Sequence, residues 1–84
     1  MKLEKLLQLI SVLSVAGNRD KDVTGMQIDS RLITAGNMFI AVKGTQTDGH
    51  AYIETAIEKG ATSIVCEILP REINENVTYI QVPD

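Results

Sequence analysis

The feature that most constrains this chain is the order of four segments between residues 38 and 66. A continuous apolar run at 38–42 is followed by a polar stretch at 43–50. Apolar residues at helical spacing then predict a helix of about ten residues that ends near Gly60. A second apolar run follows at 63–66, and both runs are too short for helices but typical of buried strands. The order strand, helix, strand predicts a parallel pair joined by a right-handed crossover.

Three further segments complete the predicted architecture. The spacing of leucine and isoleucine predicts an amphipathic helix over residues 2–13. Alternation of apolar and polar residues predicts a half-buried strand at 24–28. β-Branched and aromatic residues predict a last strand at 77–82. The expected fold class is therefore α/β, with a small mixed, partly parallel sheet and flanking helices.

The composition is that of one small globular domain and excludes two classes of partner. The chain has 84 residues, of which 44% are hydrophobic and 23% are charged. Its formal net charge is −3 with no block of like charge, so it lacks the basic stripe with which proteins contact nucleic-acid phosphates. No apolar run approaches the ~20 residues that a membrane helix needs. We therefore expect no nucleic-acid partner and no membrane span.

Polar residues gather at two places where predicted strands end. Asp29, Ser30 and Arg31 follow the strand at 24–28, and the polar stretch at 43–50 follows the run at 38–42. In open α/β sheets, ligands dock at the carboxyl ends of strands and at the N-termini of the helices that follow. This edge is therefore the candidate binding face. Arg31 suits bidentate contact with a carboxylate or a phosphate, but a local ion pair with Asp29 explains it equally well.

The loop between Gly44 and Gly49 is not a triphosphate-binding loop. The glycine spacing is right, but His50 and Ala51 stand where such a loop needs Lys and then Ser or Thr. His50 is the only histidine and has no partners at metal-ligand spacing, so we expect a structural or surface role for it. Cys66 is the only cysteine and is expected to be an inert buried thiol. The residues alone leave two alternatives open for the loop, a binding role and an ordinary connection.

Four motifs, in this order, resemble the N-terminal domain of the Mur ligases. They are Ile-Asp-Ser-Arg at 28–31, Gly-Asn-Met-Phe-Ile-Ala-Val-Lys-Gly at 36–44, Asp-Gly-His-Ala-Tyr-Ile at 48–53, and Ala-Ile followed by Gly-Ala within 56–61. The resemblance is greatest to the MurE type, the UDP-N-acetylmuramoyl-tripeptide synthetases of peptidoglycan synthesis. The alternatives are the corresponding domain of the MurF type, which shares the Asp-Ser-Arg and Asp-Gly-His elements, and a non-catalytic nucleotide-sugar-binding or interaction module.

The resemblance implies that residues 1–84 form the UDP-substrate-binding domain of a cytoplasmic, three-domain ligase. Such a ligase binds the UDP part of UDP-MurNAc-L-Ala-D-Glu and adds diaminopimelate or lysine in an ATP-dependent, amide-forming reaction. ATP and magnesium are expected only in the full-length enzyme, with ATP at a central ATP-binding domain of the same chain. The isolated domain is expected to be inactive. The sequence stops directly after the strand at 77–82, which we interpret as a boundary inside a longer protein.

The family's nucleotide contacts fall on five positions of this sequence, which are Ile28, Ser30, Thr45, Gln46 and Thr47. Members of the family often have His where this chain has Thr45. No catalytic residue and no metal ligand of the family has a counterpart here. The resemblance therefore predicts a binding site without catalytic groups.

Overall fold

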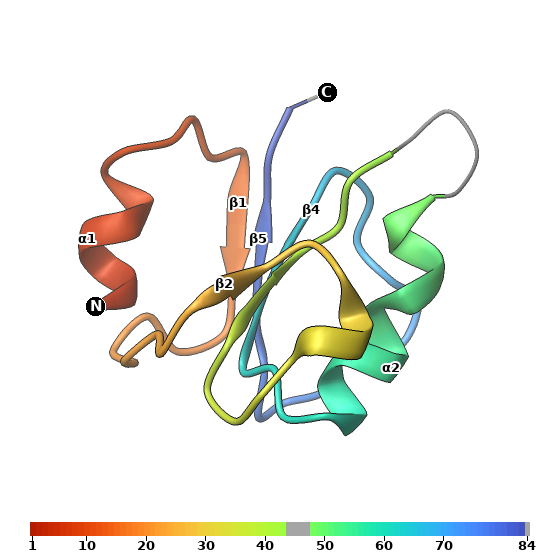
Figure 1. The fold of residues 1–84 in the computed structure, drawn as a ribbon. Helices are drawn as coiled ribbons and strands as arrows, with labels where there is room; N and C mark the ends of the chain where they lie inside the picture. The colour runs from red at the N-terminus through yellow and green to blue at the C-terminus, as the bar shows by residue number, and fades with distance from the viewer. Residues whose placement is uncertain (44–47, 84) are drawn as a thin grey trace.

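The computed structural model describes residues 1–43 and 48–83 (Figure 1). Within them, five strands form one sheet in the order β1-β5-β4-β3-β2. The strands are β1 (Ser14–Ala16), β2 (Met26–Gln27), β3 (Met38–Ile40), β4 (Ser63–Cys66) and β5 (Thr78–Gln81). Strands β2 to β5 are mutually parallel, and β1 is antiparallel to β5. The mixed, partly parallel α/β sheet expected from the sequence is therefore confirmed.

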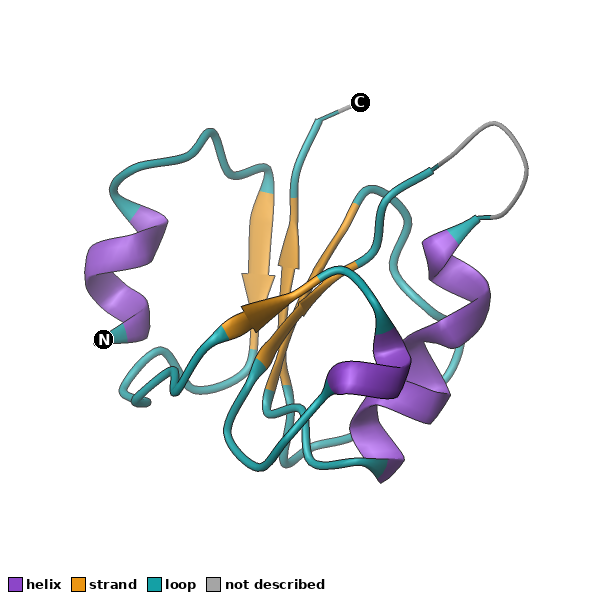
Figure 2. Ribbon diagram, in the orientation of Figure 1, coloured by secondary structure: helices purple, strands orange, loops and turns teal. Residues whose placement is uncertain are grey.

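Helical segments cover both faces of this sheet (Figure 2). One face carries α1 (Leu3–Leu7), and the other carries α2 (Ile53–Glu58) together with the short 3-10 helices η1 (Ser30–Leu32) and η2 (Gly49–Tyr52). We call these two sides the α1 face and the α2 face.

Successive side chains of the central strands alternate between the two faces. Phe39, Ile64 and Tyr79 belong to the core beneath α2. Their neighbours Met38 and Val65 belong to the core beneath α1. Because β3 and β4 are covered on both sides, they consist of nearly continuous runs of buried residues, and the sequence shows no polar alternation there.

The segment from β3 to β4 has the predicted organisation. Asp48 is the N-cap of η2, since its side chain accepts a hydrogen bond from the N–H of His50 at 3.0 Å. The four residues of η2 run directly into the six of α2, which matches the helix predicted after the polar loop. Gly60 ends α2 at φ +117°, and the N–H of Ala61 donates to the carbonyl of Ala56 at 3.0 Å. Asp48 and Gly60, from which the sequence predicts the start and the end of this helix, thus lie at the two ends of the η2–α2 segment.

The N-terminal helix is much shorter than predicted. Instead of a helix over 2–13, α1 ends at Leu7, and β1, which the sequence pattern does not predict, follows it. Leu9 and Leu13 are 77% and 65% exposed, so the helical spacing of leucine extends beyond the buried surface. The N–H of Leu13 donates to the carbonyl of Gln81 at 2.8 Å, directly before β1 pairs with β5. Pairing with a strand distant in sequence therefore overrides the local helical preference.

The strand predicted at 24–28 is also wrong in extent and burial. β2 contains only two residues and lies at the edge of the sheet. Met26 and Ile28 are 53% and 67% exposed, whereas Val23 is buried. The last predicted strand is confirmed as β5, although it is shorter than 77–82. The edge position contributes to the exposure of β2, because β2 pairs with β3 on one side only.

Candidate ligand-binding site

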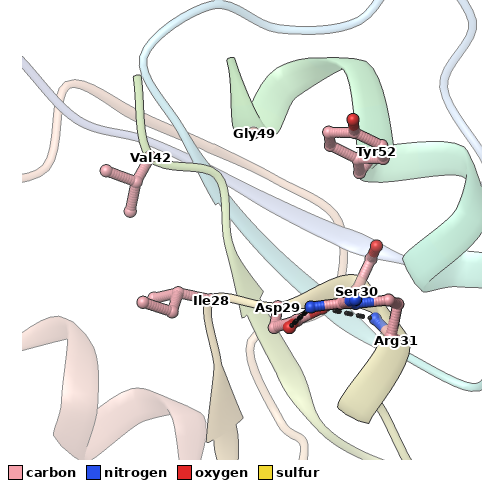
Figure 3. A pocket seen from close by; sticks show the side chains of 7 residues that line it. All are labelled: Ile28, Asp29, Ser30, Arg31, Val42, Gly49 and Tyr52. Carbon is pink, nitrogen blue, oxygen red and sulfur yellow. Dashed lines mark hydrogen bonds and ion pairs between the residues drawn. The ribbon is translucent and has the colours of Figure 1, made fainter. Parts of the chain in front are cut away.

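A pocket of about 520 Å³ lies at the carboxyl ends of β2 and β3, beside η1 and η2 (Figure 3). Its walls are made by seven residues, which are Ile28, Asp29, Ser30, Arg31, Val42, Gly49 and Tyr52. The volume is within the range of small-molecule sites. The pocket therefore lies where the strand-end argument places the candidate binding face.

The predicted site residues fall into two groups. Ile28 and Ser30 both line the pocket. Thr45, Gln46 and Thr47 lie outside the described residues, although Gly49, two positions after Thr47, is part of the wall. A role for all five in binding stays a prediction.

Asp29 and Arg31 form a close ion pair at the rim of the pocket (Figure 3). Oδ1 of Asp29 accepts from the backbone N–H and from Nε of Arg31, at 2.9 and 3.0 Å, and Oδ2 accepts from Nη2 at 2.7 Å. These hydrogen bonds, first those from the side chain, lower the pKa of Asp29 to about 2. The local pair is confirmed. The Arg31 side chain remains 82% exposed, and Arg31 is one of the residues that line the pocket.

Ser30 presents a hydroxyl at the centre of this wall. The residue is only 7% exposed, and its Oγ makes no hydrogen bond to any residue that the structure describes. Figure 3 shows the hydroxyl on the pocket side of η1, turned toward Tyr52. Because the hydroxyl has no partner in the described residues, it can hydrogen-bond a ligand without breaking a contact with any of them.

Three pocket residues are missing from the sequence-derived site. The sequence predicts Val42 within a buried strand, but it lies beyond the end of β3 and is 49% exposed. Tyr52 is 44% exposed, and its position one turn after the polar loop was the available signal. Gly49 approaches Val42 closely, since its N–H donates to the Val42 carbonyl at 2.7 Å. A Cβ on Gly49 would lie 2.6 Å from the Val42 nitrogen, so the glycine is required by this contact.

The described residues offer no cluster of side chains that could hold a metal ion. In residues 1–43 and 48–83, no group of three or more His, Cys, Asp and Glu side chains could hold a metal ion. The two carboxylates nearest the pocket are engaged, Asp29 by Arg31 and Asp48 by His50. No magnesium site is therefore assigned within residues 1–43 and 48–83.

Cys66 is buried in the core, as predicted. Burial raises the pKa of its thiol, which keeps the sulfur protonated and poorly reactive at neutral pH. In the part of the chain that the structure describes, no helix has the length and apolar character needed to span a bilayer.

The chain has a small α/β fold with a candidate ligand pocket, and comparison with known proteins identifies its family. A family model described as "Mur ligase family, catalytic domain" matches residues 22–83. The UDP-N-acetylmuramoyl-L-alanyl-D-glutamate--2,6-diaminopimelate ligase of Bacteroides fragilis is 56% identical over 84 residues, which are 100% of this chain and 17% of that protein. The ligase of the same name from Clostridioides difficile is 43% identical over the same share of both chains. The chain therefore belongs to the Mur ligase family.

Two Mur ligases of known structure resemble this fold. MurF from Acinetobacter baumannii superimposes with a TM-score of 0.62 at 26% identity, over 74% of this chain and 13% of that one. MurF from Thermotoga maritima in complex with ADP gives a TM-score of 0.60 at 30% identity, over 68% of this chain and 13% of that one. The MurF structures match less of the chain, and at lower identity, than the diaminopimelate ligases do. The expected MurE-type resemblance is thus confirmed. The chain spans 17% of the length of the curated relatives named above.

Proposed function

We propose that this chain is the part of a MurE-type ligase that holds the UDP end of UDP-N-acetylmuramoyl-L-alanyl-D-glutamate. The observation that carries the proposal is the pocket at the strand ends, which contains both described positions that match the family's nucleotide contacts, Ile28 and Ser30. The relatives that align with the whole of this chain are named as 2,6-diaminopimelate ligases, which favours diaminopimelate over lysine as the residue that the ligase adds.

The chemistry of the pocket suits a uridine diphosphate. A flat base needs apolar walls, and the exposed side chains of Ile28 and Val42 supply them. A ribose or a base edge needs a hydrogen-bonding group, which the Ser30 hydroxyl offers. A diphosphate favours a nearby cation, and the exposed Arg31 guanidinium lies at the rim. We assign Thr45, Gln46 and Thr47 to the same ligand by their match to the family.

The remaining functions are proposed for other parts of the ligase. By family resemblance, ATP, magnesium and the amide-forming step are assigned to a central domain of the same polypeptide. The described residues here contain no group of three or more His, Cys, Asp and Glu side chains that could hold a metal ion. The cytoplasmic location expected from the sequence is proposed on family membership alone.

The proposal is tested by Ser30→Ala. Loss of one hydrogen bond costs ~0.5–1.5 kcal/mol, which corresponds to roughly three- to tenfold weaker binding of the UDP substrate. The melting temperature should stay nearly unchanged, because the Oγ makes no hydrogen bond to a described residue. Isothermal titration of the UDP-MurNAc-dipeptide into both proteins, with thermal melts alongside, measures both effects.

The matched control is Ser11→Ala, an exposed serine on the α1 face, which should change neither quantity. Equal affinity of wild type and Ser30→Ala would remove Ser30 from the site. If free-domain binding is too weak to measure, the Michaelis constant for the UDP substrate in the whole ligase replaces the titration.

A further inference from the structure

We propose that His50 is a positioning residue that fixes the η2 wall of the pocket to the sheet. The inference rests on the proposed function, because its consequence is measured on binding of the UDP substrate. The Mur ligase comparisons and the predicted contact residues give His50 no role. The proposal starts from the position of its imidazole, which is only 13% exposed.

Both ring nitrogens of His50 have protein partners. Nε2 lies 3.0 Å from the backbone nitrogen of Glu67 and 3.3 Å from that of Ile68. Backbone N–H groups only donate, so Nε2 is the acceptor and the ring proton lies on Nδ1. Nδ1 then donates to Oδ1 of Asp48 at 2.7 Å. Hydrogen bonds from His50, first from its backbone N–H and then from the ring, hold the pKa of Asp48 below its ordinary value.

The imidazole therefore connects two segments. Asp48 and His50 belong to the capped η2 turn, whereas Glu67 and Ile68 follow β4. η2 supplies Gly49 and Tyr52 to the pocket wall, but it is a single 3-10 turn, which is weak by itself. A turn of this kind needs contacts with the rest of the fold to keep its place.

The anchoring point after β4 is itself tied to the sheet. The Gln81 side chain donates from Nε2 to the Glu67 carbonyl at 3.1 Å, and its Oε1 accepts from Ser14 Oγ at 3.0 Å. A line of hydrogen bonds thus runs from Asp48 through His50 and Gln81 to β1. The position of the pocket wall is set by this line as well as by packing of α2.

His50 acts through its neighbours and does not touch the ligand. The pocket lining does not include it, and a role as base or metal ligand would require breaking one of its two contacts. The expected effect of its loss is therefore on the Michaelis constant for the UDP substrate, with turnover at saturation little changed.

Three substitutions separate the two contacts. His50→Gln keeps an acceptor near the position of Nε2, whereas His50→Asn keeps a donor near the position of Nδ1 and loses that acceptor. His50→Phe keeps only the ring. Because losing one such hydrogen bond costs on the order of 1 kcal/mol, we expect the Michaelis constant to rise roughly five- to tenfold in Phe and Asn. His50→Gln should stay within about threefold of wild type, since one acceptor for Glu67 is retained.

The measurements are steady-state kinetics of the whole ligase and amide exchange at Glu67 and Ile68. We expect faster exchange at both amides in the His50→Asn and His50→Phe variants. In the His50→Gln variant, both amides should be as protected as in the wild type. If His50→Phe does not fold, the comparison of His50→Asn with His50→Gln tests the proposal by itself. A general loss of melting temperature with an unchanged Michaelis constant in all variants that fold would overturn the inference.

Ser30→Ala in the same kinetic series keeps this test distinct from that of the proposed function. If Ser30→Ala raises the Michaelis constant and the His50 variants do not, the positioning role alone fails. If neither residue affects it, the pocket is not the UDP site and both proposals fail.

Discussion

The two faces of the sheet differ in how completely they are covered. On the α2 face, η1, η2 and α2 close over a core that includes Phe39, Ile64 and Tyr79. On the α1 face, a five-residue helix leaves an apolar hollow of about 580 Å³. Its lining includes Leu9, Ile10, Met26, Ile40 and Val82. The candidate site borders the closed face, where the backbone that carries it is held in place.

The two principal helices show why the faces differ. α2 begins beside a capped 3-10 turn and ends at Gly60, so local hydrogen bonds define both of its ends. In α1, the N-cap residue Lys2 makes no capping hydrogen bond with its side chain, and the C-cap residue is Gln8 and not a glycine. It is held by contacts with a distant segment, including a hydrogen bond from the Leu3 N–H to the Lys21 carbonyl at 2.9 Å. We infer that the α2 face contributes most of the stability and that the α1 face contributes less.

The largest expected effect is at the centre of the α2 face. Ile64 is 0% exposed, and Ile64→Ala removes its side chain from a closed core. A cost of about 2–5 kcal/mol in the free energy of unfolding is typical of such a change. Met26→Ala on the open face should cost less than about 0.5 kcal/mol, because Met26 is 53% exposed. Urea unfolding of both variants measures the difference, and similar losses would show that the two faces are equally important.

A smaller effect is expected where α2 ends. Gly60→Ala places a Cβ at φ +117°, 2.9 Å from the Ala35 Cα. Strain of this kind costs on the order of 1–3 kcal/mol. The matched change at the end of α1 is Gln8→Ala, where the backbone is right-handed helical and no strain arises. Thermal or urea unfolding should show a clear loss for Gly60→Ala only, and an equal loss at Gln8 would contradict the distinction between the helices.

The smallest effect is the acid dependence of the Asp29–Arg31 pair. The pKa of Asp29 is lowered from 3.8 to about 2 in the folded chain. The carboxylate therefore stabilises the fold at pH values above about 4, and this contribution is lost as the pH falls toward 2. The difference in unfolding midpoint between wild type and Asp29→Asn should be small at pH 7, since the pair is exposed, and should shrink toward pH 2. A difference that stays constant between pH 7 and pH 2 would contradict the low pKa.

The sequence predicts the α2 face well because its local signals agree with its packing. Asp48 and Gly60 lie at the two ends of the helical segment as predicted, and the two apolar runs contain β3 and β4, although β3 ends two residues before the first run does. The α1 face could not be predicted in the same way. Leu13 continues the helical pattern of the N-terminus, but its N–H bonds to Gln81, a residue far along the chain. No local pattern contains that pairing.

The candidate site shows the same division. Ser30 is predicted as a site residue because it follows a predicted strand, whereas Gly49 is missed although it lies in the Asp-Gly-His motif. The contribution of Val42 to the pocket depends on where β3 ends. The contacts of His50 with Glu67 and Ile68 join a segment that precedes α2 in the sequence to one that follows it. Such relations follow from the folded arrangement and have no periodic or spacing signal in the sequence.

The central claim is that the pocket bordering the α2 face, and not the hollow of the α1 face, holds the uridine nucleotide. A titration of the ¹⁵N-labelled chain with UDP, followed by ¹H–¹⁵N correlation spectra, compares the two sites directly. The account predicts saturable shifts at Ser30, Gly49 and Tyr52, with none at Leu9 or Met26. Saturable shifts centred on Leu9 and Met26, or none at Ser30, Gly49 and Tyr52 at UDP concentrations that saturate the whole ligase, would contradict it.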